Sequence, residues 1–274
     1  MRFAVSEDGK TFDEPLIFDT PQNFDEALKV FGGALEDVRR GRKIESGAGG
    51  IAGVWNKERT ELVFSPHLAG WVGKPIKVEF QKILGGPVFV ANDADLVGLG
   101  EASAGAGQGY KIVTYITVST GVGGTRIVSG AIEKSVFGFE PGHQIIDISA
   151  SIEPHLNPRG TIEDFVSGSA LHRRTGKHPR EIFDSHIWDE LAERLAYGLH
   201  NTILHWSPDV VVLGGAMMIK SPGISIERVR EYLKKIMKTF PELPDLKLAT
   251  LGERGGLHGA LAYLSQMSNK PQNA

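Results

Sequence analysis

One aspartate lies shortly after an apolar run, at a position where its carboxylate could act as an acid–base group. Val88-Phe89-Val90 is typical of a buried strand, and Asn92-Asp93-Ala94 comes directly after it. A carboxylate at the carboxyl end of a strand can take the proton of a substrate hydroxyl, which is general-base chemistry. An Asn-Asp pair is equally typical of a helix N-cap. Asp93 is therefore a candidate base, and helix capping remains the structural alternative.

A glycine-rich segment follows a second predicted strand, which covers residues 111–119. The segment is Ser119-Thr120-Gly121-Val122-Gly123-Gly124-Thr125. Glycines let backbone N–H groups come close to an anion, and hydroxyls add further donors. A plain turn between two strands explains the same residues equally well. Gly214-Gly215 ends a third apolar run, where open α/β sheets bind ligands, although this pair alone is weak evidence.

Two further segments carry side chains suited to a polar ligand. Glu140-Pro141-Gly142-His143 and Glu163 offer carboxylate acceptors and an imidazole that can donate and accept. A lone histidine such as His143 is more often structural than functional. These residues are candidates only in combination with the others.

Gly47-x-Gly49-x-x-Ala52 fits the dinucleotide-binding fingerprint, which requires a helix to begin directly after it. The residues that follow, Gly53-Val54-Trp55, instead resemble a strand and a turn. The sequence therefore favours a different role for this glycine cluster.

The elements that must position these residues alternate between strands and helices, which predicts an α/β protein with two sheets. In the first half we expect a hairpin over residues 2–5 and 11–18, a helix over 24–40 capped by Asn23, and a glycine cluster at 47–50. A second hairpin over 53–55 and 61–64, a helix over 76–84, a strand over 88–90 and a helix to about 104 follow. In the second half we expect a strand over 111–119, a tight loop at 121–124, short strands to about 148, a helix over 188–206, a strand over 210–213, a helix over 226–240, a strand over 246–250 and a helix over 257–267.

The composition narrows the class of protein. The chain has 274 residues with 34 glycines, no cysteine, and 30 basic against 33 acidic residues. The absence of cysteine excludes disulfides and thiolate metal sites, and the near balance of charge gives no general attraction to nucleic acid or anionic membranes. No apolar stretch approaches the length of a membrane span, and the N-terminus lacks a signal-peptide pattern. These features favour a cytoplasmic enzyme of about two domains.

Together the motifs resemble the ROK family, which includes repressors, open reading frames and sugar kinases. In the family's order they are Ser65-Pro66-His67-Leu68-Ala69-Gly70-Trp71, Asn92-Asp93-Ala94, Ser119-Thr120-Gly121-Val122-Gly123-Gly124, Glu140-Pro141-Gly142-His143, Gly160-Thr161-Ile162-Glu163, Ser167-Gly168-Ser169-Ala170 and Gly256-Leu257-His258-Gly259-Ala260. The resemblance covers nearly the whole chain.

The resemblance implies an α/β protein with a two-domain actin-like (ribonuclease H-like) fold that holds a sugar and ATP in the interdomain cleft. The smaller N-terminal domain would comprise residues 1–92 and 259–274, and the larger C-terminal domain residues 93–258. The implied activity is ATP-dependent phosphorylation of a hexose or an N-acylated hexosamine at its 6-hydroxyl, with Mg²⁺. The expected partners are the sugar and ATP without nucleic acid or membrane, and a homodimer is common among relatives.

The same resemblance assigns roles to individual residues. Asp93 would be the general base that acts on the sugar hydroxyl. The sugar-binding residues would be Asn92, Asp93, Gly121, Glu140, His143, Glu163 and His67. The ATP-binding residues would be Thr120, Gly121 and Gly123 by the phosphates and Gly214 and Gly215 near the adenosine.

The chain departs from the family pattern at three places. Pro154, Leu156 and Thr161 stand at the cysteine positions of the family's zinc motif, so no zinc is expected although Glu163 is retained. His67 replaces the usual asparagine of the sugar-side loop, which bears on sugar specificity.

The third departure concerns the D-x-G-G-T motif, which handles Mg²⁺ and phosphate in the family and does not occur in this sequence. We therefore expect the first strand of the N-terminal domain, which would lie between the second strand and residues 88–90, to be missing. On this expectation the chain alone has little kinase activity and low stability. The alternative function is a catalytically impaired sugar-binding or sensor protein of the same family.

Overall fold

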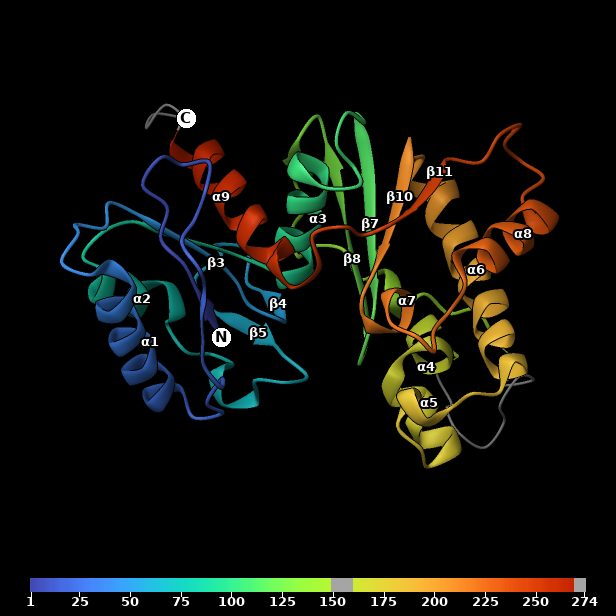
Figure 1. Ribbon diagram of the computed structural model, residues 1–274, viewed down its shortest axis with the longest axis horizontal. Coiled ribbons are helices and arrows are strands. Elements are labelled where there is room, and N and C mark those ends of the chain that lie inside the picture. The colour runs from blue at the N-terminus through green and yellow to red at the C-terminus, as the bar shows by residue number, and fades with distance from the viewer. Residues whose placement is uncertain (149–159, 269–274) are drawn as a thin grey trace. The chain divides into compact units, whose positions relative to one another are not determined.

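The computed structural model describes residues 1–148 and 160–268 of the chain (Figure 1). Two compact units emerge from the contacts between residues. The first comprises residues 1–100, 134–138 and 253–274, and the second comprises residues 101–133 and 139–252. The domain division expected from the sequence, at 92/93 and 258/259, stays a prediction.

The first unit contains short strands that pair in three separate ladders. Antiparallel pairs join β1 (Arg2–Phe3) to β2 (Leu16–Ile17) and β4 (Val54–Trp55) to β5 (Leu62–Phe64), and a parallel pair joins β3 (Gly47–Gly50) to β6 (Val88–Ala91). The helices of this unit are α1 (Phe24–Arg39), η1 (Ala69–Trp71), α2 (Ile76–Leu84), the start of α3 (Asp93–Ala104) and α9 (Gly255–Ser268). Both predicted hairpins are confirmed.

Helix α1 begins where the sequence predicts, because the side chain of Asn23 accepts a hydrogen bond from the N–H of Glu26. Its apolar face packs on α2, where the rings of Phe31 and Phe80 stack with centroids 4.3 Å apart. Trp71 meets Phe80 edge to face. This aromatic cluster fixes the two helices against each other and against the strands that lead to Asp93.

The glycine cluster at residues 47–50, for which the sequence predicted no element, forms strand β3. Its register runs from Gly47 beside Val88 to Gly50 beside Ala91. Three glycines carry no side chain, so the alternation that marks a strand is absent from the sequence. The glycine at position 50 is needed for packing, since a Cβ there would lie 3.0 Å from the Cα of Asp93. The strand paired with β6 among the described residues is therefore β3, so the expectation that a first strand would lie beside residues 88–90 is wrong.

The second unit is built on a five-stranded mixed sheet. The strand order is β11 (Asp245–Leu248), β10 (Val210–Gly214), β7 (Ile112–Val118), β8 (Val122–Val128) and β9 (Ala131–Ile132), with β11, β10 and β7 parallel and β8 and β9 antiparallel. The helices are η2 (Pro141–His143), α4 (Ile162–Val166), α5 (Gly168–Thr175), η3 (Pro179–Glu181), α6 (Ser185–Trp206), α7 (Ala216–Ile219) and α8 (Ile226–Ile236), and η4 (Gly252–Arg254) follows at the end of the unit.

The tight loop predicted at residues 121–124 is also wrong. Strand β8 begins at Val122, so Gly123 and Gly124 lie in the sheet opposite Thr117 and Ile116. The reversal is confined to residues 119–121, where the N–H of Ser119 donates to the carbonyl of Gly121 over 2.8 Å. The glycines of the strand resemble a loop in sequence because they lack the side chains that indicate a strand.

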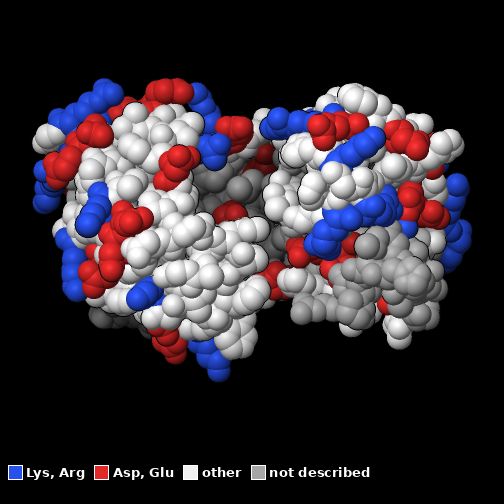
Figure 2. Space-filling model, turned by 90° about the horizontal axis from the view of Figure 1, so that it is seen from below, with Lys and Arg blue, Asp and Glu red and all other residues white. Residues whose placement is uncertain are grey.

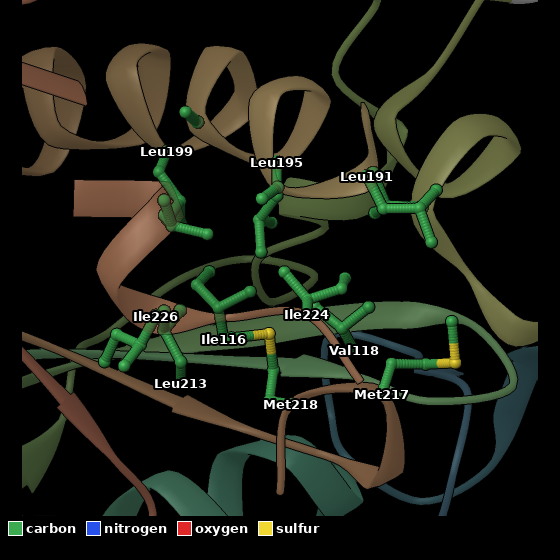
Figure 3. Close-up of a cluster of buried hydrophobic side chains, with 14 of the residues drawn as sticks. Ile116, Val118, Leu191, Leu195, Leu199, Leu213, Met217, Met218, Ile224 and Ile226 are labelled. Carbon is green, nitrogen blue, oxygen red and sulfur yellow. The ribbon is translucent and has the colours of Figure 1, made fainter. Parts of the chain in front are cut away.

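A leucine stripe on α6 forms the core of the second unit. Leu191, Leu195 and Leu199 recur every four residues and point toward the sheet (Figure 3). Below them lie Ile116 and Val118 of β7, Leu213 of β10, and Met217, Met218, Ile224 and Ile226. Burying one such side chain contributes about 1.5–3 kcal/mol to the free energy of unfolding. The cluster therefore fixes the ends of β7 and β10, which lead to residues 119–121 and 214–215.

The surface of each unit carries charges of both signs. Basic and acidic side chains are interspersed on the face shown in Figure 2. Among residues 1–148 and 160–268, no helix is both long enough and apolar enough to cross a membrane.

Candidate functional site

Asp93 is the first residue of α3 and follows β6 after one residue. Its side chain is open to solvent, and its Oδ1 accepts a hydrogen bond from the N–H of Ala94 over 3.0 Å. Desolvation by surrounding atoms raises the pKa of the Asp93 carboxyl, against the smaller lowering effects of backbone hydrogen bonds and of His67. A raised pKa makes a carboxylate a stronger proton acceptor.

Asn92 supports the start of α3 in the way the structural alternative predicts. Its Oδ1 accepts the N–H of Ala94 over 2.8 Å, and its Nδ2 donates to the carbonyl of Gly53 over 3.0 Å. The second bond ties the β4–β5 hairpin to the helix that carries Asp93. The N-cap of α3 is therefore Asn92, while the Asp93 carboxylate accepts backbone N–H groups, namely those of Ala94 and of Asp93 itself.

His67 lies in the loop between β5 and η1, close enough to Asp93 for its charge to lower the pKa of that carboxyl. Ser65 shapes the loop, since its hydroxyl donates to Ala52 over 2.8 Å and accepts the N–H of Leu68 over 3.1 Å. The imidazole itself is exposed. Residues 67, 92 and 93, predicted from separate motifs, thus gather in the first unit.

The second unit presents the turn at residues 119–121, which links β7 to β8. Within the described residues, the N–H groups of Thr120 and Gly121 donate to no protein acceptor. The carbonyls of Ser119 and Thr120 accept the N–H groups of Gly168 and Ser169 over 2.7 and 3.2 Å. The carbonyl groups of the turn are thus bonded to the start of α5, and its free N–H groups suit a phosphate oxygen.

Glu163 lies against this turn. Helix α4 begins with a capping box in which Thr161 and Asp164 bond each other's backbone, and Glu163 follows the cap by two residues. The Oε2 of Glu163 accepts the N–H of Val122 over 2.8 Å. A Cβ on Gly121 would lie 2.6 Å from the same oxygen, so a larger residue here would displace the Glu163 carboxylate.

Glu140 precedes the 3₁₀ helix η2 and His143 is its last residue, with Oε2 and Nε2 3.9 Å apart and both side chains exposed. The helix rests on β8, because a Cβ on Gly142 would lie 2.0 Å from the carbonyl of Val122. The N–H of Ile162 in α4 donates to the carbonyl of Gln144, next after η2. The structure therefore brings Glu140, His143, Glu163 and Gly121 into one region of the second unit.

Gly214 and Gly215 end β10 beside the end of β7. A Cβ on Gly214 would lie 2.5 Å from the phenol oxygen of Tyr115. Gly215 has a φ of 86°, and a Cβ there would lie 2.3 Å from the carbonyl of Val118. Packing alone therefore explains both glycines, and a role of either one near adenosine stays a prediction. Gly123 lies inside β8, and its proposed role by the phosphates also stays a prediction.

The sequence assigned no individual role to three supporting residues, namely Gly50, Gly53 and Ser65. Their contribution is made through contacts between distant segments, and the signals in the sequence are the glycine excess around residues 47–53 and the motif at residues 65–71. Two of the residues at the family's zinc positions, Pro154 and Leu156, lie outside the described residues.

The model of the ROK family matches residues 2–267 of this chain. Because that match covers nearly the whole chain, the protein belongs to the ROK family. A glucokinase of Streptomyces coelicolor is 26% identical in an alignment 277 residues long, gaps included. The alignment covers 88% of this chain and 86% of that protein. Other similar proteins are named as fructokinases and as an N-acetyl-D-glucosamine kinase.

Solved structures give the fold. The ROK hexokinase of Thermus thermophilus has a TM-score of 0.83 and 27% identity, with 96% of this chain and 94% of that chain covered. A ROK glucokinase of Streptomyces griseus, solved with glucose and AMPPNP, has a TM-score of 0.76 at 24% identity, with 96% and 95% covered. The expected actin-like ATPase fold is confirmed.

Proposed function

We propose that this ROK-family protein transfers the γ-phosphoryl group of ATP to the 6-hydroxyl of a hexose or an N-acylated hexosamine, with Asp93 as the general base. Similarity to glucokinases, fructokinases and an N-acetyl-D-glucosamine kinase supports phosphorylation of a sugar. The observation that carries the assignment of the base is the environment of Asp93. Asp93 is an exposed residue, yet the atoms around its carboxyl displace enough water to raise the pKa of that group.

The chemistry requires few groups from the protein. Phosphoryl transfer depends mainly on positioning and on neutralising charge, so one base and oriented donors form a sufficient set. In the proposal Asp93 takes the hydroxyl proton as the sugar oxygen attacks phosphorus. His67 and Asn92 of the first unit, and Gly121, Glu140, His143 and Glu163 of the second, bind the sugar.

The nucleotide is assigned to the second unit. The free N–H groups of Thr120 and Gly121 suit phosphate oxygens, and Gly123, Gly214 and Gly215 complete the proposed ATP-binding set. Among the described residues, no three or more His, Asp or Glu side chains form a cluster that could hold a metal ion. Mg²⁺ commonly binds through substrate phosphates and water, so we assign it to the nucleotide rather than to a protein ligand set.

A sugar-binding protein without efficient catalysis is the second candidate. The sequence contains no D-x-G-G-T, and no strand among the described residues joins the β1–β2 ladder to the β3–β6 ladder. This candidate shares the sugar-binding residues with the first and differs in the rate of phosphoryl transfer.

A sugar panel tests the proposal and separates the two candidates. ADP release is measured with glucose, fructose, mannose, N-acetylglucosamine and N-acetylmannosamine, and ³¹P NMR locates the phosphate on the product. The kinase proposal predicts ADP release that depends on one or more of these sugars, with the phosphate on oxygen 6. Sugar binding without sugar-dependent ADP release would favour the second candidate, and neither binding nor turnover would contradict both.

A further inference from the structure

One oxygen of Glu163 supports the turn at residues 119–121, and its other oxygen is unused. Oε2 accepts the N–H of Val122 over 2.8 Å. In the part of the chain that the structure describes, Oε1 accepts no hydrogen bond, and the residue is only half-buried. A carboxylate in this state has one oxygen available to a ligand while the other remains bonded to the protein.

The bonded oxygen reaches the part of the turn that carries the free amides. Val122 directly follows Gly121, and the absence of a side chain at Gly121 is what lets the carboxylate approach, since a Cβ would lie 2.6 Å from Oε2. Moving Glu163 therefore moves or releases the N–H of Val122 and disturbs its neighbour Gly121.

The same pair of short helices holds the other end of the turn. Ser167 ends α4 and caps α5, and the first residues of α5 donate from Gly168 to Ser119 and from Ser169 to Thr120. The turn is thus anchored at three backbone points by residues 163–169, of which the Glu163 contact alone is made by a side chain. That contact can respond to a ligand without unfolding a helix.

We propose that Glu163 is a positioning residue that couples sugar binding to nucleotide binding through the turn at residues 119–121. This inference rests on the proposed function, in which a sugar hydroxyl bonds Oε1 and phosphate oxygens accept the N–H groups of Thr120 and Gly121. Sugar on Oε1 fixes the carboxylate, the fixed carboxylate holds Val122, and the turn is ordered before the nucleotide arrives. By linkage, the nucleotide strengthens sugar binding by the same factor.

Calorimetric titration of ADP, with and without saturating glucose, fructose or N-acetylglucosamine, measures the coupling in the 274-residue chain. We expect the sugar that binds to tighten ADP binding by about fivefold or more. Glu163→Ala should weaken ADP binding about three- to tenfold even without sugar, because the bond to Val122 is lost, and should abolish the coupling. Glu163→Gln keeps an amide oxygen for Val122, so its sugar-free ADP affinity should stay within about twofold of the parent's while sugar binding weakens.

Asp164→Ala is the matched control on the same helix. Asp164 accepts the N–H and the hydroxyl of Thr161, lies 3.8 Å from Arg173 of α5, and has no hydrogen bond to the turn. Its loss therefore weakens the start of α4 and this weak ion pair while leaving the three bonds to the turn in place. This variant should melt at a lower temperature and bind ADP as the parent does. Equal sugar-free ADP affinity in the parent and in Glu163→Ala, or an equal loss in Asp164→Ala, would overturn the inference.

The parent protein distinguishes this inference from the proposed function. If it binds ADP and a sugar with no effect of one on the other, the coupling is wrong and the proposed function stands. If it binds neither ligand, both are wrong.

Discussion

Asp93 combines a chemical role with an energetic cost to the fold. Desolvation raises the pKa of its carboxyl, so the folded protein holds an anion in an unfavourable place at neutral pH. Asparagine keeps the size and removes the charge. We expect Asp93→Asn to melt at the same or a higher temperature than the parent and to bind sugar within a few-fold of the parent's affinity. A large drop in melting temperature, measured by calorimetry, would contradict this account of the residue.

The same pKa predicts the pH dependence of turnover. A general base works only when deprotonated, so kcat/KM should fall on acidification with an apparent pKa above the ~3.9 of an ordinary aspartate. The charge of His67 lowers the pKa of Asp93. His67→Asn removes that charge, so the acid limb of the profile should move to higher pH. An acid limb that stays in place or moves to lower pH would show that His67 does not act on the base.

At the residue scale the sequence predicted that Asn92 and Asp93 lie between a strand end and a helix start, because both signals are visible in one short segment. It left open which residue caps the helix, and the structure gives that role to Asn92. The supporting roles of Gly53 and Ser65 were not predicted because their bonds join segments that are distant in the chain. Such contacts leave no local pattern.

At the scale of elements, the buried carboxylate of Glu101 in α3 joins that helix to the segment that follows β11. Glu101 is 1% exposed and accepts the N–H groups of Ala106 over 2.9 Å, Thr250 over 3.0 Å and Leu251 over 2.9 Å. Removing the carboxylate leaves the N–H groups of Ala106, Thr250 and Leu251 without this partner, in places that are only partly buried. Because a buried donor left unpaired costs ~1–3 kcal/mol and partial access of water reduces that cost, Glu101→Ala should lower the free energy of unfolding by about 1–3 kcal/mol.

Urea unfolding measures this effect, with Glu36→Gln as the control. Glu36 is exposed and pairs with Arg39 on the surface of α1, so its loss should change the free energy of unfolding by no more than about 0.5 kcal/mol. A similar small change in both variants would show that Glu101 does not fix these elements.

Long helices and apolar strands were easier to predict than short helices such as α4 and α5 or strands that begin in glycine-rich segments. Helices α1 and α2 combine apolar residues at helical spacing with recognisable ends, Asn23 for the first and Gly85 with a φ of 75° for the second. Strands β3 and β8 begin in glycine-rich segments, where side-chain alternation is missing. There the strand forms because a neighbouring strand supplies the ladder, which a local reading of sequence does not contain.

At the scale of the whole molecule, the three separate ladders of the first unit allow a test of the missing-strand expectation. The structure places β3 beside β6, so an added strand would have to pair with the free edge of β3. Fusing a short segment that carries D-x-G-G-T ahead of Met1 should raise the melting temperature, because edge N–H and C=O groups gain partners. A Gly-Ser segment of equal length is the control, and an equal effect of both segments would contradict the expectation.

The central claim is that Asp93 is the base in transfer of phosphate to a sugar hydroxyl. The most direct test is the single-turnover rate of sugar phosphorylation for the parent and for Asp93→Asn at saturating sugar and ATP, in the 274-residue chain and in the D-x-G-G-T fusion. In whichever form is active, we expect Asp93→Asn to slow the reaction by ~10²–10⁴-fold while sugar still binds. A rate within a few-fold of the parent's would show that another group takes the proton.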